Sequence, residues 1–127
     1  MGSIDQGNSY IFPINSGDSF VGQYASTTNF SEILISVETD TKFTLTINFS
    51  SNGKDLGLTQ NYVENTPSAN AFIYRIPPLL RYFQVELLNT DTTNQLYLRL
   101  ETLLKSVMIY QENNNAPATN VVITNPL

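Results

Sequence analysis

The 127-residue sequence contains no cysteine, no histidine and no tryptophan. A chain without cysteine forms no disulfide, has no thiol nucleophile and carries no mark of its redox compartment. A chain without histidine lacks the most common metal ligand and the usual general base of enzymes. The sequence therefore predicts a non-enzymatic protein with no catalytic residue, no metal site and no cofactor.

Charged residues are also scarce. They make up 13% of the chain, about half the share that is usual for a soluble domain. The six Lys and Arg residues are scattered and the net charge is -5, which argues against a nucleic-acid partner because phosphate binding needs a basic patch. A surface made polar by amides and hydroxyls has little charge repulsion between copies. This composition favours self-association.

Long apolar runs are absent as well. No stretch of about 18 apolar residues occurs, so we expect no membrane span. The first ten residues, MGSIDQGNSY, have neither the basic start nor the apolar run of a secretory signal peptide. We expect a protein that is made in the cell interior without a cleaved signal.

The sequence does contain an apolar-polar alternation of period two, which is typical of half-buried strands. Residues 42–49 alternate strictly, and residues 31–40 alternate with Leu34 as the one exception. The Asn52-Gly53 pair predicts a hairpin, because both residues tolerate positive φ at the centre of a turn. Further strands are predicted at 19–23, 56–63, 71–76, 82–88 and from 95 onward, with an edge strand at 10–14 as an option.

The pattern after Leu100 is ambiguous, because the apolar residues there also fit one face of a helix. We favour a strand, since the alternation before it is strict and the segment ends in the β-formers Val107, Ile109 and Tyr110. A short C-terminal helix is the alternative.

Seven or eight short strands separated by turn residues predict an all-β protein. The expected fold is a single antiparallel β-sandwich with jelly-roll or Greek-key topology. We expect an N-terminal arm over residues 1–18, the sandwich over residues 19–111, and a polar linker with a C-terminal arm over residues 112–127.

Four segments between Phe20 and Leu104 occur in an order that is similar to a known family. They are FVGQY, FSSNGKDLG, RYFQVELLN and LYLRLETLL. Together they resemble the β-sandwich module of virion structural proteins from large DNA viruses and tailed bacteriophages, in which a glycine-aromatic opening precedes an F-S-x-[DN]-G hairpin and two core strands. This chain has Asn52 and Lys54 where the family often has an acidic turn.

The resemblance implies a capsid, vertex or fibre role and transfers no catalytic residue. We expect a virion protein that self-associates and helps to build the capsid shell at a vertex, as a penton does. Its partners would be its own copies and other coat proteins. The alternative is a carbohydrate- or receptor-binding β-sandwich module that recognises a glycan.

The acidic and basic residues give no catalytic pattern. Glu38 with Asp40 and Glu86 with Glu101 are the only near pairs, and each is predicted on an outward face where nothing separates the two pKa values as catalysis requires. The strand arginines Arg75, Arg81 and Arg99 are predicted to pair with Glu86 or Glu101 across ladders. Asp and Asn in loops are explained by turn hydrogen bonds.

Tyrosine is the main candidate for contact with a partner, because its ring buries area while its hydroxyl keeps a hydrogen bond. Residues 121–123 are a short apolar segment after a polar linker, and they are predicted to pair with a sheet edge on a neighbouring subunit. The predicted interface residues are Tyr24, Tyr62, Tyr82, Tyr97, Tyr110, Val121 and Ile123. Exposed tyrosines in a planar row would instead favour sugar binding.

Overall fold

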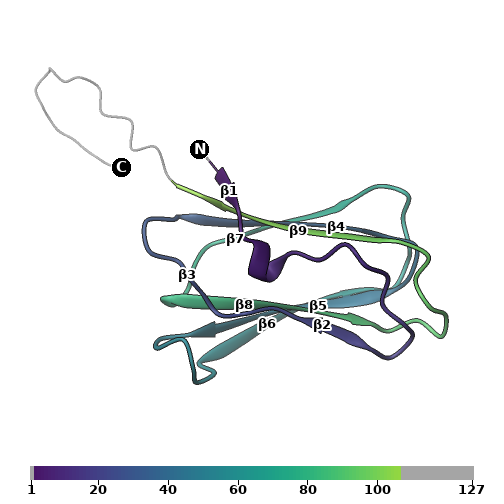
Figure 1. Cartoon of the computed structure of the whole chain (residues 1–127), viewed down its shortest axis with the longest axis horizontal. Coiled ribbons are helices and arrows are strands. Elements are labelled where there is room, and N and C mark those ends of the chain that lie inside the picture. Colours follow the sequence, from purple (N-terminus) through teal and green to yellow (C-terminus); the bar gives the residue numbers. More distant parts are fainter. Residues whose placement is uncertain (1, 107–127) are drawn as a thin grey trace, which may run out of the picture.

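A computed structural model describes residues 2–106 of the chain. These residues form a β-sandwich of two antiparallel sheets, shown edge-on in Figure 1. The strands are β1 Gly2–Ile4, β2 Ser19–Val21, β3 Ala25–Ser26, β4 Glu32–Thr39, β5 Phe43–Ser50, β6 Leu58–Glu64, β7 Phe72–Ile76, β8 Tyr82–Asn89 and β9 Leu98–Lys105, and one short 3-10 helix, η1, spans Gln6–Asn8. In this part of the chain no helix is long and apolar enough to cross a membrane.

The two sheets are built from strands that are not consecutive in sequence. Sheet A has the order β1-β9-β4-β7, and sheet B has the order β2-β8-β5-β6 with β3 also paired to β8. The chain crosses between the sheets at β1–β2, β3–β4, β4–β5, β6–β7, β7–β8 and β8–β9. Repeated crossing of this kind is found in jelly rolls. The predicted antiparallel β-sandwich is therefore confirmed.

The alternation in the sequence determines which side chains enter the core. β4 buries every second residue, with Leu34 pointing outward, and β5 does the same as far as Ile47 and then buries Asn48, Phe49 and Ser50 as well. The fully buried centre contains three phenylalanines from β5 and β8, packed against Ile and Val from β4. Phe43 also meets the ring of Phe72 edge-on, with centroids 5.5 Å apart. Burial of one such side chain stabilises the fold by roughly 2 kcal/mol.

The β5–β6 connection confirms the predicted hairpin but corrects its turn. Asn52 does not have positive φ, whereas Gly53 does, at 80°. The turn is longer than two residues, because the last pair of the ladder is Phe49 with Leu58. The side-chain Oδ1 of Asn52 instead accepts hydrogen bonds from the backbone N–H groups of Lys54 and Asp55. Asn52 therefore stabilises a wide loop.

The strand prediction after Leu100 is confirmed over the described residues. β9 continues to Lys105 and buries Leu100, Thr102 and Leu104 on its inner face. The helical alternative is wrong there. The residues after Ser106, including the predicted β-formers at 107, 109 and 110, lie outside the described residues.

The N-terminal segment, predicted as an arm over residues 1–18, packs along the sandwich from residue 2 onward (Figure 1). β1 pairs with β9, and Ile14 is 5% exposed within the core. The optional strand at 10–14 is reduced to one bridge, between Tyr10 and Leu100. The segment runs from β9 of sheet A to β2 of sheet B and covers the side of the sandwich on which β1 and β2 are the edge strands.

Asn8 joins the two sheets where the N-terminal segment crosses between them. Its side chain is fully buried. Its Oδ1 accepts the N–H of Val85 on β8 at 2.8 Å, and its carbonyl oxygen accepts the hydroxyl of Thr102 on β9 at 2.7 Å. Its Nδ2 donates to the carbonyl of Gln23 at 2.8 Å. Asn8 thus takes the place of a strand partner in the gap between β2 and β3.

Glycine at position 22 leaves the space for this side chain. A Cβ atom at Gly22 would lie 2.1 Å from Oδ1 of Asn8 and 2.9 Å from the carbonyl oxygen of Gly7. The backbone of Gly22 also donates to the carbonyl of Val85 at 2.8 Å. Any other residue at 22 must displace the Asn8 amide from Val85.

We predict that Gly22→Ala lowers the free energy of unfolding by about 2–4 kcal/mol, because overpacking adds to the loss of a buried hydrogen bond. Urea denaturation followed by circular dichroism measures this loss. Gly7→Ala is the matched control, since its Cβ would meet no atom closer than 3.5 Å. Equal stability of the Gly22→Ala and wild-type proteins would contradict the role of Asn8.

Candidate functional site

The carboxylates of the two near pairs are predicted to be surface charges, and the structure places them on outward faces or in a loop. Glu86 lies on the outer face of sheet B and Glu101 on the outer face of sheet A, on opposite surfaces of the sandwich. Glu38 accepts from Arg99, with 2.9 Å between the charged atoms. Asp40 accepts the N–H of Leu96 at 3.0 Å. Glu38 and Asp40 therefore have separate hydrogen-bond partners, and Glu86 and Glu101 are separated by the whole sandwich.

Loop carboxylates likewise serve the backbone. Asp91 accepts the N–H of Lys42 at 3.1 Å and that of Thr92 at 2.8 Å. The hydrogen bond from the Lys42 backbone lowers the pKa of the Asp91 carboxyl. Over residues 2–106 no group of three His, Cys, Asp or Glu side chains lies close enough to hold a metal ion.

The arginines have other partners than the sequence predicted. Arg75 pairs with Glu32 at 3.2 Å and Arg99 pairs with Glu38, both across ladders of sheet A. The prediction that Arg75 and Arg99 pair with Glu86 or Glu101 is wrong, because the alternation alone does not reveal which strands are neighbours. Arg81 lies at the start of β8, and no ion pair is found for it among the described residues.

The predicted tyrosines do not gather in one row. Tyr97 is 46% exposed in the loop before β9, whereas Tyr24, Tyr62 and Tyr82 are half-buried at three other places. Tyr110, Val121 and Ile123 lie outside the described residues. The planar row of rings that would favour sugar binding is therefore not formed by the tyrosines of residues 2–106.

Tyr62 belongs to a cluster between the two sheets. Its ring lies 4.9 Å from that of Tyr74 on β7, and the Tyr74 hydroxyl donates to the Glu64 carboxylate at 2.6 Å. Burial, with the Glu64 hydrogen bond and charge as further causes, raises the pKa of Tyr74 well above its usual range. This cluster fills the sandwich on the side where β6 and β7 are the last strands.

The outer face of sheet A carries an apolar row that the sequence analysis missed. Ile4, Leu103 and Leu34 lie directly opposite one another on β1, β9 and β4. Ile73 on β7 follows diagonally and is 54% exposed, while Ile4 is 47% exposed. The one available signal was Leu34, which interrupts the polar face of its strand.

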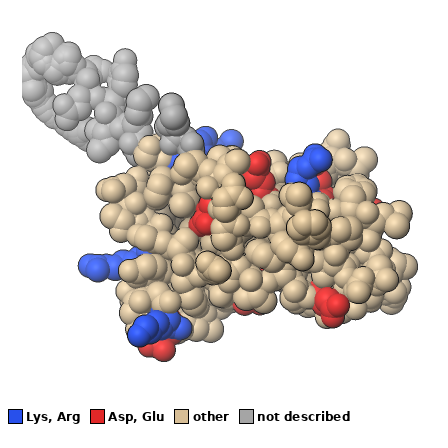
Figure 2. Space-filling view, viewed as in Figure 1, with Lys and Arg blue, Asp and Glu red and all other residues tan. Residues whose placement is uncertain are grey.

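Opposite charges flank this row in equal numbers. Arg75, Arg99 and Lys105 alternate with three glutamates across the same face. On the face of the molecule that Figure 2 shows, few side chains are charged and most of the surface is uncharged. An apolar row with balanced charges on both sides is a surface that can contact another protein without net repulsion.

The outer face of sheet B combines a hydrogen-bonded polar network with the exposed apolar side chains Val21, Val63 and Leu88. Asn48 on β5 donates to Gln84 and Glu86 on β8, and its side-chain Oδ1 accepts the hydroxyl of Thr59 on β6. Beside this network the hydroxyl of Thr46 donates to the side chain of Asn61. The face is held by side-chain amides and hydroxyls, with Glu86 as its acid.

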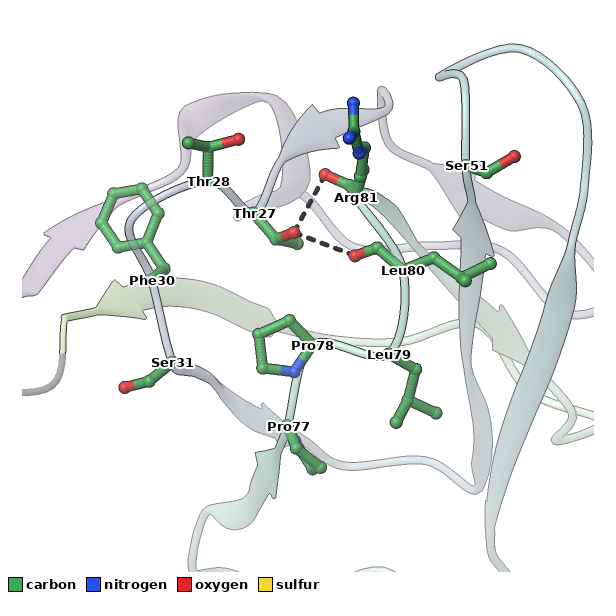
Figure 3. Close-up of a pocket in the computed structure, with 10 residues that line it drawn as sticks. All are labelled: Thr27, Thr28, Phe30, Ser31, Ser51, Pro77, Pro78, Leu79, Leu80 and Arg81. Atoms are coloured by element: carbon green, nitrogen blue, oxygen red, sulfur yellow. Dashed lines mark hydrogen bonds between the residues drawn. The ribbon is translucent and has the colours of Figure 1, made fainter. Parts of the chain in front are cut away.

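An open pocket of about 780 Å³ lies at the end of the sandwich where β8 begins. Figure 3 shows Phe30 and Pro78 on two loops facing each other across it, with Thr27 joining the loops through bonds to the carbonyls of Leu80 and Arg81 at 2.9 Å. Its lining residues include one phenylalanine, two prolines, two leucines, four Ser and Thr residues and Arg81.

Comparison with known proteins identifies the fold but not the family. No protein-family model matches the sequence, and no curated protein matches it either. Among solved structures, the PBSX exported protein XepA is similar over 97% of this chain with a TM-score of 0.64 and 13% identity. This chain covers 43% of XepA, so it spans less than half of that protein.

Two carbohydrate-binding modules are less similar. TmCBM61, solved with β-1,4-galactotriose, gives a TM-score of 0.45 at 7% identity over 82% of this chain and 85% of its own. CsCBM6-3 from Clostridium stercorarium, solved with cellobiose, gives 0.40 at 12% identity over 83% and 87%. Scores this low carry no conclusion about function.

The Tyr74–Glu64 bond predicts a change of stability at alkaline pH. A raised pKa in the folded state means that the stabilisation is complete below about pH 10, the value for unfolded tyrosine, and is lost as the pH rises above it. We predict that Tyr74→Phe lowers the free energy of unfolding by about 1–2 kcal/mol at pH 7, and that this difference from wild type narrows above pH 10.

Urea denaturation at pH 7, 10 and 11 tests this pH dependence. Tyr97→Phe removes a hydroxyl from an exposed ring and serves as the control, with a stability that should follow the wild type at each pH. If the difference in free energy of unfolding between wild type and Tyr74→Phe stays constant up to pH 11, the Tyr74 hydroxyl titrates alike in the folded and unfolded states. That result would contradict the prediction.

Proposed function

We propose that this chain is a non-enzymatic structural module that self-associates within a virion or a phage-derived assembly. Its partners are further copies of the chain and other coat proteins. The observation that carries the proposal is the apolar row Ile4–Leu103–Leu34 with Ile73 on the outer face of sheet A. Such a row is exposed in the isolated chain and is stabilised when another protein covers it.

Two further observations support this function. XepA, a phage PBSX exported protein, has a similar fold over nearly the whole chain. The four sequence segments that resemble virion structural proteins fall in and between the strands of the sandwich, from β2 to β9. Neither observation involves a catalytic residue.

Within such an assembly we propose a place in the capsid shell at a vertex, as in a penton. A vertex is closed by several copies of one short subunit, and a single small sandwich suits this geometry. The same module is suited to a minor capsid or fibre-head position, where it would also contact copies of itself.

We predict that the purified chain is an oligomer, and that Ile4→Ser with Ile73→Ser reduces the oligomer to smaller species with little change in melting temperature. Both side chains are about half exposed, so their truncation removes contact area rather than core. Size-exclusion chromatography with light scattering measures the masses.

Leu96→Ser is the matched control, because Leu96 is 82% exposed and stands apart from the row. It should leave the oligomer unchanged. A wild-type chain that stays monomeric at every concentration would overturn the proposed function.

A glycan-binding module is the second candidate, and the pocket at the end of the sandwich is the observation that favours it. Phe30 can stack on a sugar ring, and Arg81 is exposed at the rim with hydroxyls nearby. Small-ligand sites combine apolar walls with a few polar groups in this way.

If the chain binds a glycan there, titration calorimetry should detect saturable binding to an oligosaccharide, weakened at least tenfold by Arg81→Ala. Lys54→Ala, which removes a cation from the β5–β6 turn, is the control and should bind as the wild type does. Absence of binding across a broad oligosaccharide panel would eliminate this candidate.

A further inference from the structure

The two sides of the sandwich differ in the length of their edge strands and in whether another segment covers them. On one side the edge strands are short, with three residues in β1, three in β2 and two in β3. The N-terminal segment covers this side, and the side chain of Asn8 occupies the gap in the sheet B edge. On the other side the edge strands β6 and β7 have seven and five residues.

β6 is the longest of these edge strands. Proteins usually protect such an edge with lysine, proline, a bulge or a covering segment. β6 contains none of the first two, and its ladder with β5 runs through seven consecutive pairs without a bulge. Its one charge, on Glu64 at the last position, is engaged by the Tyr74 hydroxyl. No element of the described chain pairs with its outer side.

The hydrogen bonding of sheet B indicates which main-chain groups of β6 have no partner strand among residues 2–106. Val85 on β8 directs its N–H away from β5, toward Asn8. Hydrogen-bonding direction alternates along an antiparallel strand, so even-numbered residues of β8 and of β5 bond each other and odd-numbered residues of β5 bond β6. The N–H and C=O groups of Thr59, Asn61 and Val63 therefore point out from the edge.

We infer that β6 pairs antiparallel with β6 of a second copy, about a twofold axis at Asn61, so that sheet B continues from one subunit into the next. This inference rests on the proposed function and adds a contact surface to the apolar row of sheet A. It assigns the unpaired main-chain groups of three residues on each copy to hydrogen bonds with the other copy.

The β6 sequence is complementary to itself in this register. The facing pairs are Leu58 with Glu64, Thr59 with Val63, Gln60 with Tyr62, and Asn61 with Asn61. No like charges face each other, because the two Glu64 residues lie at opposite ends of the paired strands. Val63, which is 58% exposed, gains a neighbour in Thr59 of the second copy.

A pair of seven-residue strands buries a modest surface area, so two copies joined by this contact alone should associate weakly. Several such contacts in one assembly would reinforce each other through their high effective concentration. This agrees with a structural module whose association is strong only when many copies are joined.

The register provides a sharp test, because it places residue 61 of one copy opposite residue 61 of the other. Asn61→Lys and Asn61→Glu each put like charges face to face, which destabilises a strand pair. Sedimentation of the full chain over a range of concentrations should show that each variant pairs at least tenfold more weakly than the wild type. An equimolar mixture of the two variants should regain association as mixed pairs.

Two controls separate the edge from other effects. Thr46→Val removes the hydrogen bond that Thr46 makes to Asn61 without adding charge at the edge, and it should pair as the wild type does. Thr92→Lys adds the same charge in the exposed β8–β9 loop and should also leave pairing unchanged. Circular dichroism confirms that each variant is folded.

Each other outcome overturns the inference in a distinguishable way. If the wild type associates and Asn61→Lys associates equally, β6 is not the contact, although the proposed function stands. If both variants lose association and the mixture does not regain it, the edge binds another segment. Loss of association on deleting residues 116–127, with no effect of Asn61→Lys, would assign the contact to the C-terminal segment. A monomeric wild type would overturn both proposals.

Discussion

The hydrogen bond from the Val85 N–H to the side chain of Asn8 is the interaction on which the architecture depends. It is fully buried and lies where β2 leaves the edge of sheet B, and Asn8 also accepts a bond from Thr102 of sheet A. The N-terminal segment is fixed to both sheets at this one residue. A buried backbone N–H without a partner costs about 1–3 kcal/mol, so loss of the Asn8 side chain would weaken the side of the sandwich that this segment covers, which the β1–β9 ladder and the Tyr10–Leu100 bridge also hold. The absence of a Cβ at Gly22 leaves the space that the Asn8 side chain occupies.

The main strands could be predicted from the sequence because their alternation is strong and local. β4, β5 and β8 begin and end within a few residues of the predicted positions, β9 begins within a few residues of its predicted start, and Leu34 does point outward. The roles of Asn8 and Gly22 could not be predicted, because they depend on the approach of two residues that are 14 positions apart and belong to no periodic pattern. The arginine partners were missed for a related reason: alternation assigns each residue to a face, whereas only the strand order determines which strands are neighbours.

The difference between the two sides of the sandwich connects the fold with the proposed function. The chain uses its N-terminal segment to cover the side of β1 and β2, and the tyrosine cluster of Tyr62 and Tyr74 fills the interior on the side of β6 and β7 without covering the strand edges. A sheet with one protected and one open edge extends in a single direction, which suits a defined assembly better than unlimited aggregation. The apolar row on sheet A then supplies a second surface, directed away from the first.

Hydrogen-deuterium exchange of the associated and the dilute protein tests this account most directly. The outward amides of Thr59, Asn61 and Val63 should exchange rapidly in dilute protein and become protected on association. The Val85 amide should be protected in both states, because Asn8 accepts its hydrogen bond within each chain. Outward amides of β6 that exchange equally fast in both states, together with new protection elsewhere, would contradict the account.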